Sequence, residues 1–227
     1  MIGYEDQAKL RRSSLSAAET TLERYNRPGY HGAKRLMDVV LSTIGLIVLS
    51  PVFLAVTIAV ALSTGWPVTF KQRRVGQYGK LFSIIKFRSM VKNAEEILRS
   101  RPDLMEEYKQ NFKIENDPRI SKVGAFLRKT SLDEIPQLFN VLKGEMTLVG
   151  PRPIVEPELA KYGDHQEMYL SMKPGCTGLW QCSGRSDTTY EERIALDREY
   201  CENASVWFDL QILFKTVFAI VARKGAR

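Results

Sequence analysis

One apolar stretch dominates the pattern of hydrophobic and polar positions along the chain. It occupies residues 39–62 and contains no charged residue. A helix rises about 1.5 Å per residue, so this stretch would form a helix roughly 36 Å long, enough to cross a bilayer core of about 30 Å. It has no polar face, which disfavours the buried core helix of a soluble protein. The pattern therefore predicts a membrane segment.

Ser50 and Pro51 interrupt this stretch at its midpoint. Proline removes a backbone donor and clashes with the preceding turn, so a helix kinks or breaks there. Both ends of the stretch are flanked by basic residues, namely Lys34, Arg35, Lys71, Arg73 and Arg74. Lys and Arg beside membrane segments stay on the cytoplasmic side. The residues alone leave two structures open, a spanning helix and a re-entrant hairpin whose two ends lie on the cytoplasmic face.

After residue 67 the pattern alternates between short helical and strand-like segments. Residues 68–70 and 81–87 predict a β-hairpin around residues 76–79. We expect helices in residues 93–109, 120–129, 131–142, 188–202 and 205–222, strands in residues 146–149 and 179–182, and a turn in residues 174–178. The polar residues 1–33 are predicted to be a mobile head or a surface helix. The chain is therefore expected to have a mostly helical α+β fold, with a head (residues 1–33), a membrane segment (residues 34–66) and a domain (residues 67–227).

The last predicted helix carries a broad apolar face that includes Trp207, Phe214 and Phe218. Asp209 and Lys215 in the same helix disfavour a membrane span. An amphipathic helix in the membrane interface fits the pattern, and so does a helix whose apolar face covers the core. Both alternatives stay open.

The composition of the chain limits the classes of molecule that it is expected to bind. The chain carries a formal net charge of +7, and a basic protein with a membrane segment most simply meets anionic lipid headgroups. Nucleic acid is the competing partner, but the chain has no zinc finger and no aromatic RNA-binding signature, so we expect none. Its three cysteines suit a reducing compartment better than a disulfide framework.

Asp133 and Glu134 form the sharpest acidic pair, shortly after Arg128. A carboxylate can attack phosphorus to form an acyl phosphate, and the N-terminus of a helix favours a bound phosphate. The alternative is structural, because Ser131 and Glu134 have the spacing of a capping box. Pro136 argues against that cap, since it would then lose a hydrogen bond inside the helix. The residues alone leave catalysis and capping open.

Several cations stand near predicted turns. Lys86 and Arg88 alternate along a strand and so share one face, which is either a solvated face or a phosphate clamp. Arg128, Arg152 and Arg185 also lie in or beside turns. Chemistry on a phosphate needs such cations and usually Mg²⁺, which is held by one or two carboxylates and phosphate oxygens. The glycines never form a Walker loop, so a kinase or ATPase would lack its phosphate cradle.

Eight motifs follow one another along the chain. They are KRLMD (residues 34–38), the apolar run with Ser50 and Pro51, KFRSM (86–90), NDPR (116–119), SLDEIPQ (131–137), GEMTLVGPRP (144–153), PGCTGLWQ (174–181) and SGR (183–185). In this order they resemble the bacterial sugar transferase family, the monotopic phosphoglycosyl transferases. The resemblance covers residues 34–221 and is closest to the short enzymes that start exopolysaccharide repeat units.

The resemblance implies an enzyme that transfers a sugar 1-phosphate from a UDP-sugar, such as UDP-galactose or UDP-glucose, to undecaprenyl phosphate. UMP is released, and Mg²⁺ is the cofactor. Asp133 matches the nucleophile that forms a covalent phosphosugar intermediate, and Glu134 matches a glutamate that helps to hold Mg²⁺. The family's phosphate-binding cations match Lys86, Arg88, Arg128 and Arg152, whereas Gln181, Arg185 and Asp197 lie in matching C-terminal motifs.

The implied reaction also favours one topology for the apolar stretch. A site that takes UDP-sugar from the cytoplasm needs its cations on that side, and a re-entrant hairpin broken at Ser50 and Pro51 provides this. We therefore expect a catalytic domain on the cytoplasmic face of the bacterial inner membrane, in contact with membrane lipids. A homo-oligomer is an open possibility. The alternative function is a non-catalytic, membrane-anchored scaffold of a polysaccharide assembly complex, in which Asp133 and Glu134 only cap a helix.

Overall fold

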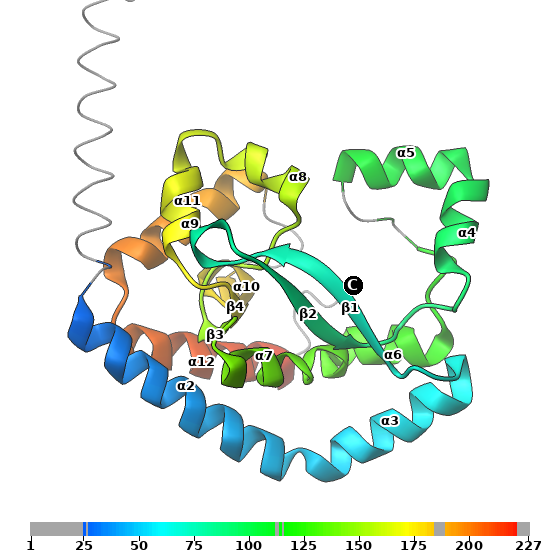
Figure 1. Ribbon diagram of the computed structural model, residues 1–227, viewed down its shortest axis with the longest axis horizontal. Coiled ribbons are helices and arrows are strands. Elements are labelled where there is room, and N and C mark those ends of the chain that lie inside the picture. Colours follow the sequence, from blue (N-terminus) through cyan, green and yellow to red (C-terminus); the bar gives the residue numbers. More distant parts are fainter. Residues whose placement is uncertain (1–24, 26, 112–113, 115, 184–188, 222–227) are drawn as a thin grey trace, which may run out of the picture.

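The computed structural model describes residue 25, residues 27–111, residue 114, residues 116–183 and residues 189–221 (Figure 1). Of the predicted head, residues 1–24 and 26 lie outside this part of the chain. Tyr25 and Tyr30 are 2% and 9% exposed. The end of the predicted head therefore packs on the hydrophobic core. The first described helix begins at Pro28, six residues earlier than expected, because proline is favourable in the first turn of a helix.

Helices α2 (Pro28–Val48) and α3 (Ser50–Thr64) form a bent pair along one side of the molecule (Figure 1). Their axes differ by 63°, so the predicted break at Ser50 and Pro51 is confirmed. The Ser50 hydroxyl donates to the carbonyl of Ile47 at 2.8 Å and satisfies a group that the break leaves free. In the described ranges no single helix is both long and apolar enough to cross a membrane. The two helices of this bent pair, taken together, have the required length and composition.

The predicted hairpin is confirmed as an antiparallel ribbon of β1 (Thr69–Val75) and β2 (Leu81–Phe87), joined by the turn η1 (Gln77–Gly79). Strand β1 extends beyond the predicted segment, to Val75. In the ribbon Phe70 lies opposite Lys86. The ribbon crosses the middle of the molecule in Figure 1, with Lys86 near the end of its second strand.

A second sheet corrects two sequence expectations. Strands β3 (Thr147–Val149) and β4 (Gly175–Thr177) pair in parallel, where a turn was predicted at residues 174–178. Gly175, which suggested a turn, instead lets the backbone of β4 approach Gly150 closely. A Cβ atom at this position would lie 2.2 Å from the nitrogen of Gly150. The strand predicted at residues 179–182 is also wrong, because that segment forms helix α10 (Leu179–Ser183).

Helices surround these two small sheets. They are α4 (Ala94–Ser100), α5 (Pro102–Asn111), α6 (Lys122–Thr130), α7 (Gln137–Lys143), α8 (Glu156–Leu159), α9 (Gln166–Ser171), α11 (Tyr190–Asn203) and α12 (Val206–Val221), with the 3-10 turns η2 (Leu132–Glu134) and η3 (Ala160–His165). Helices α4 and α5 form an arm at one end of the molecule, whereas α9 and α11 lie toward the other end (Figure 1). The fold is therefore mostly helical with a small β component, as predicted.

Buried polar side chains join the bent pair to the rest of the chain. The Asp38 carboxylate accepts from the Thr147 hydroxyl at 2.7 Å, one hydrogen bond that ties α2 to β3. The Lys34 ammonium lies 2.8 Å from an Asp209 oxygen, and their side chains are 5% and 0% exposed. Asp209 also accepts from the Tyr200 hydroxyl at 2.8 Å. Helices α2, α11 and α12 therefore meet in one buried polar network.

The apolar stretch and the last helix both expose large apolar side chains. Those on α2 and α3 include Leu36, Val40, Ile44, Ile47, Val48, Leu54, Ile58 and Leu62. On α12, Trp207, Phe214 and Phe218 are 70%, 82% and 71% exposed, whereas Asp209 and Ile212 are buried on the opposite side. The apolar face of α12 is therefore not the face that covers the core, and the alternative that it covers the core is wrong.

Candidate active site

Asp133 and Glu134 lie on the turn η2, between helices α6 and α7. Ser131 ends α6 in the left-handed conformation, with φ of 57°, and makes no side-chain cap bond to η2. Helix α7 begins only after Pro136, so the proline costs no hydrogen bond within it. The capping alternative is therefore wrong, and so is the expectation that this acidic pair starts a helix. Both carboxylates are free for other contacts.

Two cations from different elements flank the acidic pair. Lys86 on β2 donates from Nζ to Oε1 of Glu134 at 2.5 Å. Arg128 in the last turn of α6 has its charge near Asp133, and its Nε donates to the Ser89 hydroxyl at 2.8 Å. The ribbon and α6 thus bring together charges that are far apart in the sequence.

The two neighbouring carboxyl groups are shifted in opposite directions. Burial raises the pKa of Asp133, the charge of Glu134 raises it further, and Lys86 and Arg128 only partly oppose this. Burial also acts to raise the pKa of Glu134, but Lys86, the Arg152 charge and a hydrogen bond from Gln137 outweigh it and lower that pKa. Adjacent carboxyl groups in such different environments are suited to different chemical roles.

Arg152 reaches this pair from the loop after β3. Its guanidinium carbon lies 5.6 Å from the centre of the Trp180 ring, and that of Arg193 lies 4.7 Å from the same centre. The loop packs closely on its surroundings, because a Cβ atom on Gly150 would lie 2.4 Å from the carbonyl oxygen of Lys173. Stacking of this kind holds a guanidinium in place while its charge acts on a neighbour.

The remaining predicted site residues have different surroundings. Arg88 follows the last residue of β2, and its Nη1 is buried without a hydrogen-bond partner among the described residues. Gln181 follows Trp180 on α10. Arg185 lies outside the described residues. Asp197 lies on α11, and its carboxylate accepts from the Tyr162 hydroxyl at 2.9 Å. Among the described residues it is not in contact with the acidic pair.

Asp197 is 1% exposed, and burial raises its pKa to about 7, against a partial lowering by Tyr162 and Arg193. The folded protein therefore holds the proton of the Asp197 carboxyl group more tightly than the unfolded chain does. As a result, the free energy of unfolding decreases as the pH rises from the ordinary range of an aspartate toward 7. Asp197→Asn keeps an acceptor for Tyr162 and removes the titration. We expect the variant to gain roughly 2–3 kcal/mol relative to wild type between pH 5 and pH 8.

Unfolding measured at several pH values checks this expectation. Glu199→Gln, at an exposed position of the same helix, is the matched control and should follow the wild-type curve. A wild-type slope in the Asp197→Asn variant would show that Asp197 does not titrate in this range.

Three residues of the site were assigned no role from the sequence. Ser89 holds Arg128, and Gln137, which is 2% exposed, bonds to Glu134. Both residues belong to the motifs that carry the resemblance, and this membership was the signal in the sequence that could have identified them as site residues. Asn140 is fully buried; its Oδ1 accepts from the backbone N–H of Ile85 at 3.0 Å, and its Nδ2 donates to the carbonyl of Ser83 at 2.8 Å. A polar residue within an apolar helical segment was the only sign of it.

Comparison with known proteins gives a consistent result. A family model described as "Bacterial sugar transferase" matches residues 29–223. The "Undecaprenyl-phosphate galactose phosphotransferase" of Salmonella typhimurium is 50% identical over 197 residues, which are 85% of this chain and 41% of that protein. The "Exopolysaccharide production protein ExoY" of Rhizobium meliloti is 46% identical over 198 residues, which are 86% of this chain and 88% of that protein.

A third relative acts on a different sugar. The "UDP-glucose:undecaprenyl-phosphate glucose-1-phosphate transferase" of Escherichia coli K12 is 41% identical over 203 residues. These residues are 85% of this chain and 41% of that protein. The chain therefore spans about two fifths of the length of the galactose and glucose relatives and most of the length of ExoY.

Proposed function

Because the chain belongs to the bacterial sugar transferase family, we propose that it transfers a sugar 1-phosphate from a UDP-hexose to undecaprenyl phosphate and releases UMP. The names of two relatives support undecaprenyl phosphate as the acceptor and galactose or glucose as the sugar. The name of a third supports a place in exopolysaccharide synthesis. One observation carries the proposal, namely a buried Asp133 beside Arg128 and next to a Glu134 that is bonded to Lys86.

The proposed reaction has two displacements at one phosphorus atom. An oxygen of the Asp133 carboxylate attacks the phosphorus that bears the sugar, and the bond from this phosphorus to the oxygen shared with UMP breaks. UMP leaves with that oxygen and the bonding electrons, and an acyl phosphate joins Asp133 to the sugar phosphate. An oxygen of undecaprenyl phosphate then attacks the same phosphorus, which releases the Asp133 carboxylate and forms the lipid diphosphate sugar.

The surrounding charges suit this sequence of steps. Burial makes the Asp133 carboxylate more basic than usual, which strengthens it as a nucleophile. Lys86, Arg128 and Arg152 supply positive charge where phosphate oxygens would lie, and they are already held in place by Glu134, Ser89 and Trp180. Such preorganised charge stabilises a transition state without reorganisation during the reaction.

The residues fit a magnesium ion. Within the described part of the chain no three His, Cys, Asp or Glu side chains gather into a metal cage. Mg²⁺ does not need one, since it is commonly held by one or two carboxylates together with substrate phosphates and water. Glu134 would hold the ion, because its side chain is 37% exposed and its lowered pKa keeps it ionised. A bound Mg²⁺ supplies charge neutralisation at the phosphate oxygens.

Glu134→Gln is expected to weaken the magnesium dependence of turnover. The amide lacks the charge that attracts the ion, so the Mg²⁺ concentration for half-maximal rate should rise about tenfold or more. A magnesium titration of UMP release measures this. The exposed Glu167→Gln on α9 is the control and should behave as wild type. An unchanged titration in Glu134→Gln would remove this residue from the metal site.

Release of UMP tests the function as a whole. The full chain in lipid nanodiscs with undecaprenyl phosphate is given a panel of UDP-sugars, each with a radiolabelled sugar. We expect UMP to appear together with labelled lipid for UDP-galactose or UDP-glucose. No release with any sugar of the panel would favour the non-catalytic scaffold.

We further propose that the bent pair α2–α3 is a re-entrant hairpin in the inner membrane, with the catalytic domain and α12 on the cytoplasmic face. The 63° bend and the exposed apolar side chains of both helices support this topology. Tags at residues 1 and 227 should both be protected from external protease in intact cells and be cleaved once the cells are permeabilised. Cleavage at residue 1 in intact cells would instead favour a spanning segment.

A further inference from the structure

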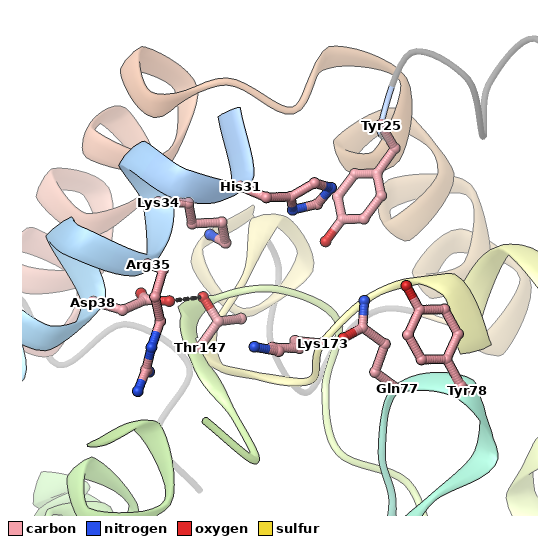
Figure 2. A pocket seen from close by; sticks show the side chains of 9 residues that line it. All are labelled: Tyr25, His31, Lys34, Arg35, Asp38, Gln77, Tyr78, Thr147 and Lys173. Atoms are coloured by element: carbon pink, nitrogen blue, oxygen red, sulfur yellow. Dashed lines mark hydrogen bonds between the residues drawn. The ribbon is translucent and has the colours of Figure 1, made fainter. Parts of the chain in front are cut away.

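A cavity of about 230 Å³ lies apart from the acidic pair, where the start of α2 faces η1 and the segment before β4 (Figure 2). Its lining includes Lys34, Arg35 and Lys173, together with His31 and a single carboxylate, Asp38. With His31 neutral, these groups carry a formal charge of +2 at the cavity wall. An apolar ligand does not suit such a wall.

The positive charge is compensated at only one of the three cations. Lys34 pairs with Asp209, which is not part of the lining, at 2.8 Å. Arg35 donates to the carbonyls of Val141 and Leu142 at 2.6 and 2.8 Å, and these acceptors carry no net charge. The sole carboxylate of the lining accepts from the Thr147 hydroxyl and the Leu148 amide, so it bonds to neutral donors.

Lys173 is the least satisfied of the cations. In the part of the chain that the structure describes it makes neither an ion pair nor a side-chain hydrogen bond. In Figure 2 its side chain lies in the middle of the cavity, between Thr147 and Gln77. Burial lowers the pKa of Lys173, and the nearby charge of Arg35 lowers it further; Asp38 partly opposes this, and Lys34 adds a smaller lowering. The cavity therefore concentrates like charges that an anion would relieve.

We propose that this cavity is a second anion site, which binds a phosphate group through Lys173 and Arg35. An ammonium and a guanidinium are the donors that phosphate oxygens prefer, and the hydroxyls of Tyr25 and Tyr78 also line the cavity. A water molecule takes about 30 Å³ of the liquid, so the cavity has room for a phosphate and a short attached group. Nothing in the proposed transfer reaction uses these residues.

The position of the cavity indicates two sources for such a phosphate. Leu36, next to Arg35, is 67% exposed and is the first of the exposed apolar residues of α2. The cavity therefore adjoins the polar end of the apolar surface of α2. A lipid headgroup and a free phosphate in the cytoplasm share the chemistry that this site would recognise.

The chain contains its own reporter for this site. It has only two histidines, of which His31 lines the cavity and His165 lies on η3. Burial lowers the pKa of His31, and after the opposing effect of the Tyr25 backbone the charges of Lys34 and Lys173 lower it further. A bound phosphate should raise this pKa by about 1, since an opposite charge at close range favours the protonated form.

The experiment is an NMR titration of both histidines in the full chain, in phosphatidylcholine nanodiscs, with inorganic phosphate added at constant ionic strength. A second set of nanodiscs contains phosphatidylglycerol and no inorganic phosphate. Three variants are compared with wild type: Lys173→Gln, Lys173→Arg as the conservative replacement, and Lys80→Gln as an exposed control beside η1. The readout needs no turnover, so it is independent of the proposed transferase activity.

We expect phosphate to raise the pKa of His31, but not of His165, in wild type, Lys173→Arg and Lys80→Gln, and this effect to be lost in Lys173→Gln. The same pattern with phosphatidylglycerol alone would identify a lipid headgroup as the ligand and would also support the site. An equal rise in Lys173→Gln, or a rise shared by His165, would reflect general surface potential and overturn the proposal. No response of His31 to either probe would overturn it as well.

Discussion

Replacing Asp133 with asparagine is expected to lower the rate of UMP release by more than about 10⁴-fold. The amide cannot form the acyl phosphate, and loss of a catalytic nucleophile in other enzymes costs about 10⁶-fold. The pair of Lys86 and Glu134 stays in place in this variant, so the loss would belong to Asp133 alone. Mass spectrometry adds a direct measurement: without acceptor lipid, wild type should gain the mass of one sugar phosphate and the variant should gain none.

A matched control separates this loss from damage to the fold. Asp164→Asn makes the same chemical change at an exposed position on η3 and should keep wild-type turnover. Both variants should unfold at the wild-type temperature or above it, because burial already disfavours the charged form of Asp133. Wild-type release of UMP by Asp133→Asn would place the nucleophile elsewhere and end the proposed mechanism.

Removal of Asp209 is expected to destabilise the fold more than a typical single substitution. Asp209→Ala leaves the Lys34 ammonium, whose side chain is 5% exposed, without its counter-charge at 2.8 Å. Breaking a buried pair in this way costs about 3–5 kcal/mol, which corresponds to a midpoint of thermal unfolding lower by roughly 6–20 °C for a chain of this size. Thermal unfolding in nanodiscs measures the shift.

A double variant distinguishes the lost charge pair from a simple loss of packing. Lys34→Met combined with Asp209→Leu replaces the pair by apolar side chains of similar volume and should recover most of the stability. Tyr30 and Tyr200 keep each other as partners, since their hydroxyl oxygens lie 3.1 Å apart. Asp103→Ala, which removes one member of the exposed ion pair with Arg101 at the start of α5, should leave the midpoint unchanged. No recovery in the double variant would contradict the electrostatic explanation.

The features that the sequence predicted well depend on neighbours along the chain. The break between α2 and α3 follows from a proline within an uncharged run, and the ribbon follows from two strand-like segments around a glycine-rich turn. Such signals act over a few residues, so they survive folding. The parallel pairing of β3 with β4 has no such signal, because 25 residues separate the two strands and short glycine-rich segments suit a turn equally well.

The site illustrates the same limit. Nothing in the spacing of Lys86 and Glu134, 48 residues apart, indicates that their side chains meet at 2.5 Å. The resemblance to a family named both residues, and the structure then supplied their contact. It also supplied two contacts that no spacing in the sequence indicates, namely the hydrogen bond between Arg128 and Ser89 and the one between Tyr162 and the buried Asp197.

Asn140 helps to keep Lys86 on the side of β2 that faces Glu134. Its side-chain amide occupies the backbone groups of Ser83 and Ile85 on the side of β2 away from β1, where a third strand would otherwise bond. A two-stranded ribbon is only marginally stable by itself, and a slip of one residue would turn Lys86 to the opposite face. A single buried amide on α7 therefore blocks strand slippage, and with it the loss of the cation on which Glu134 depends.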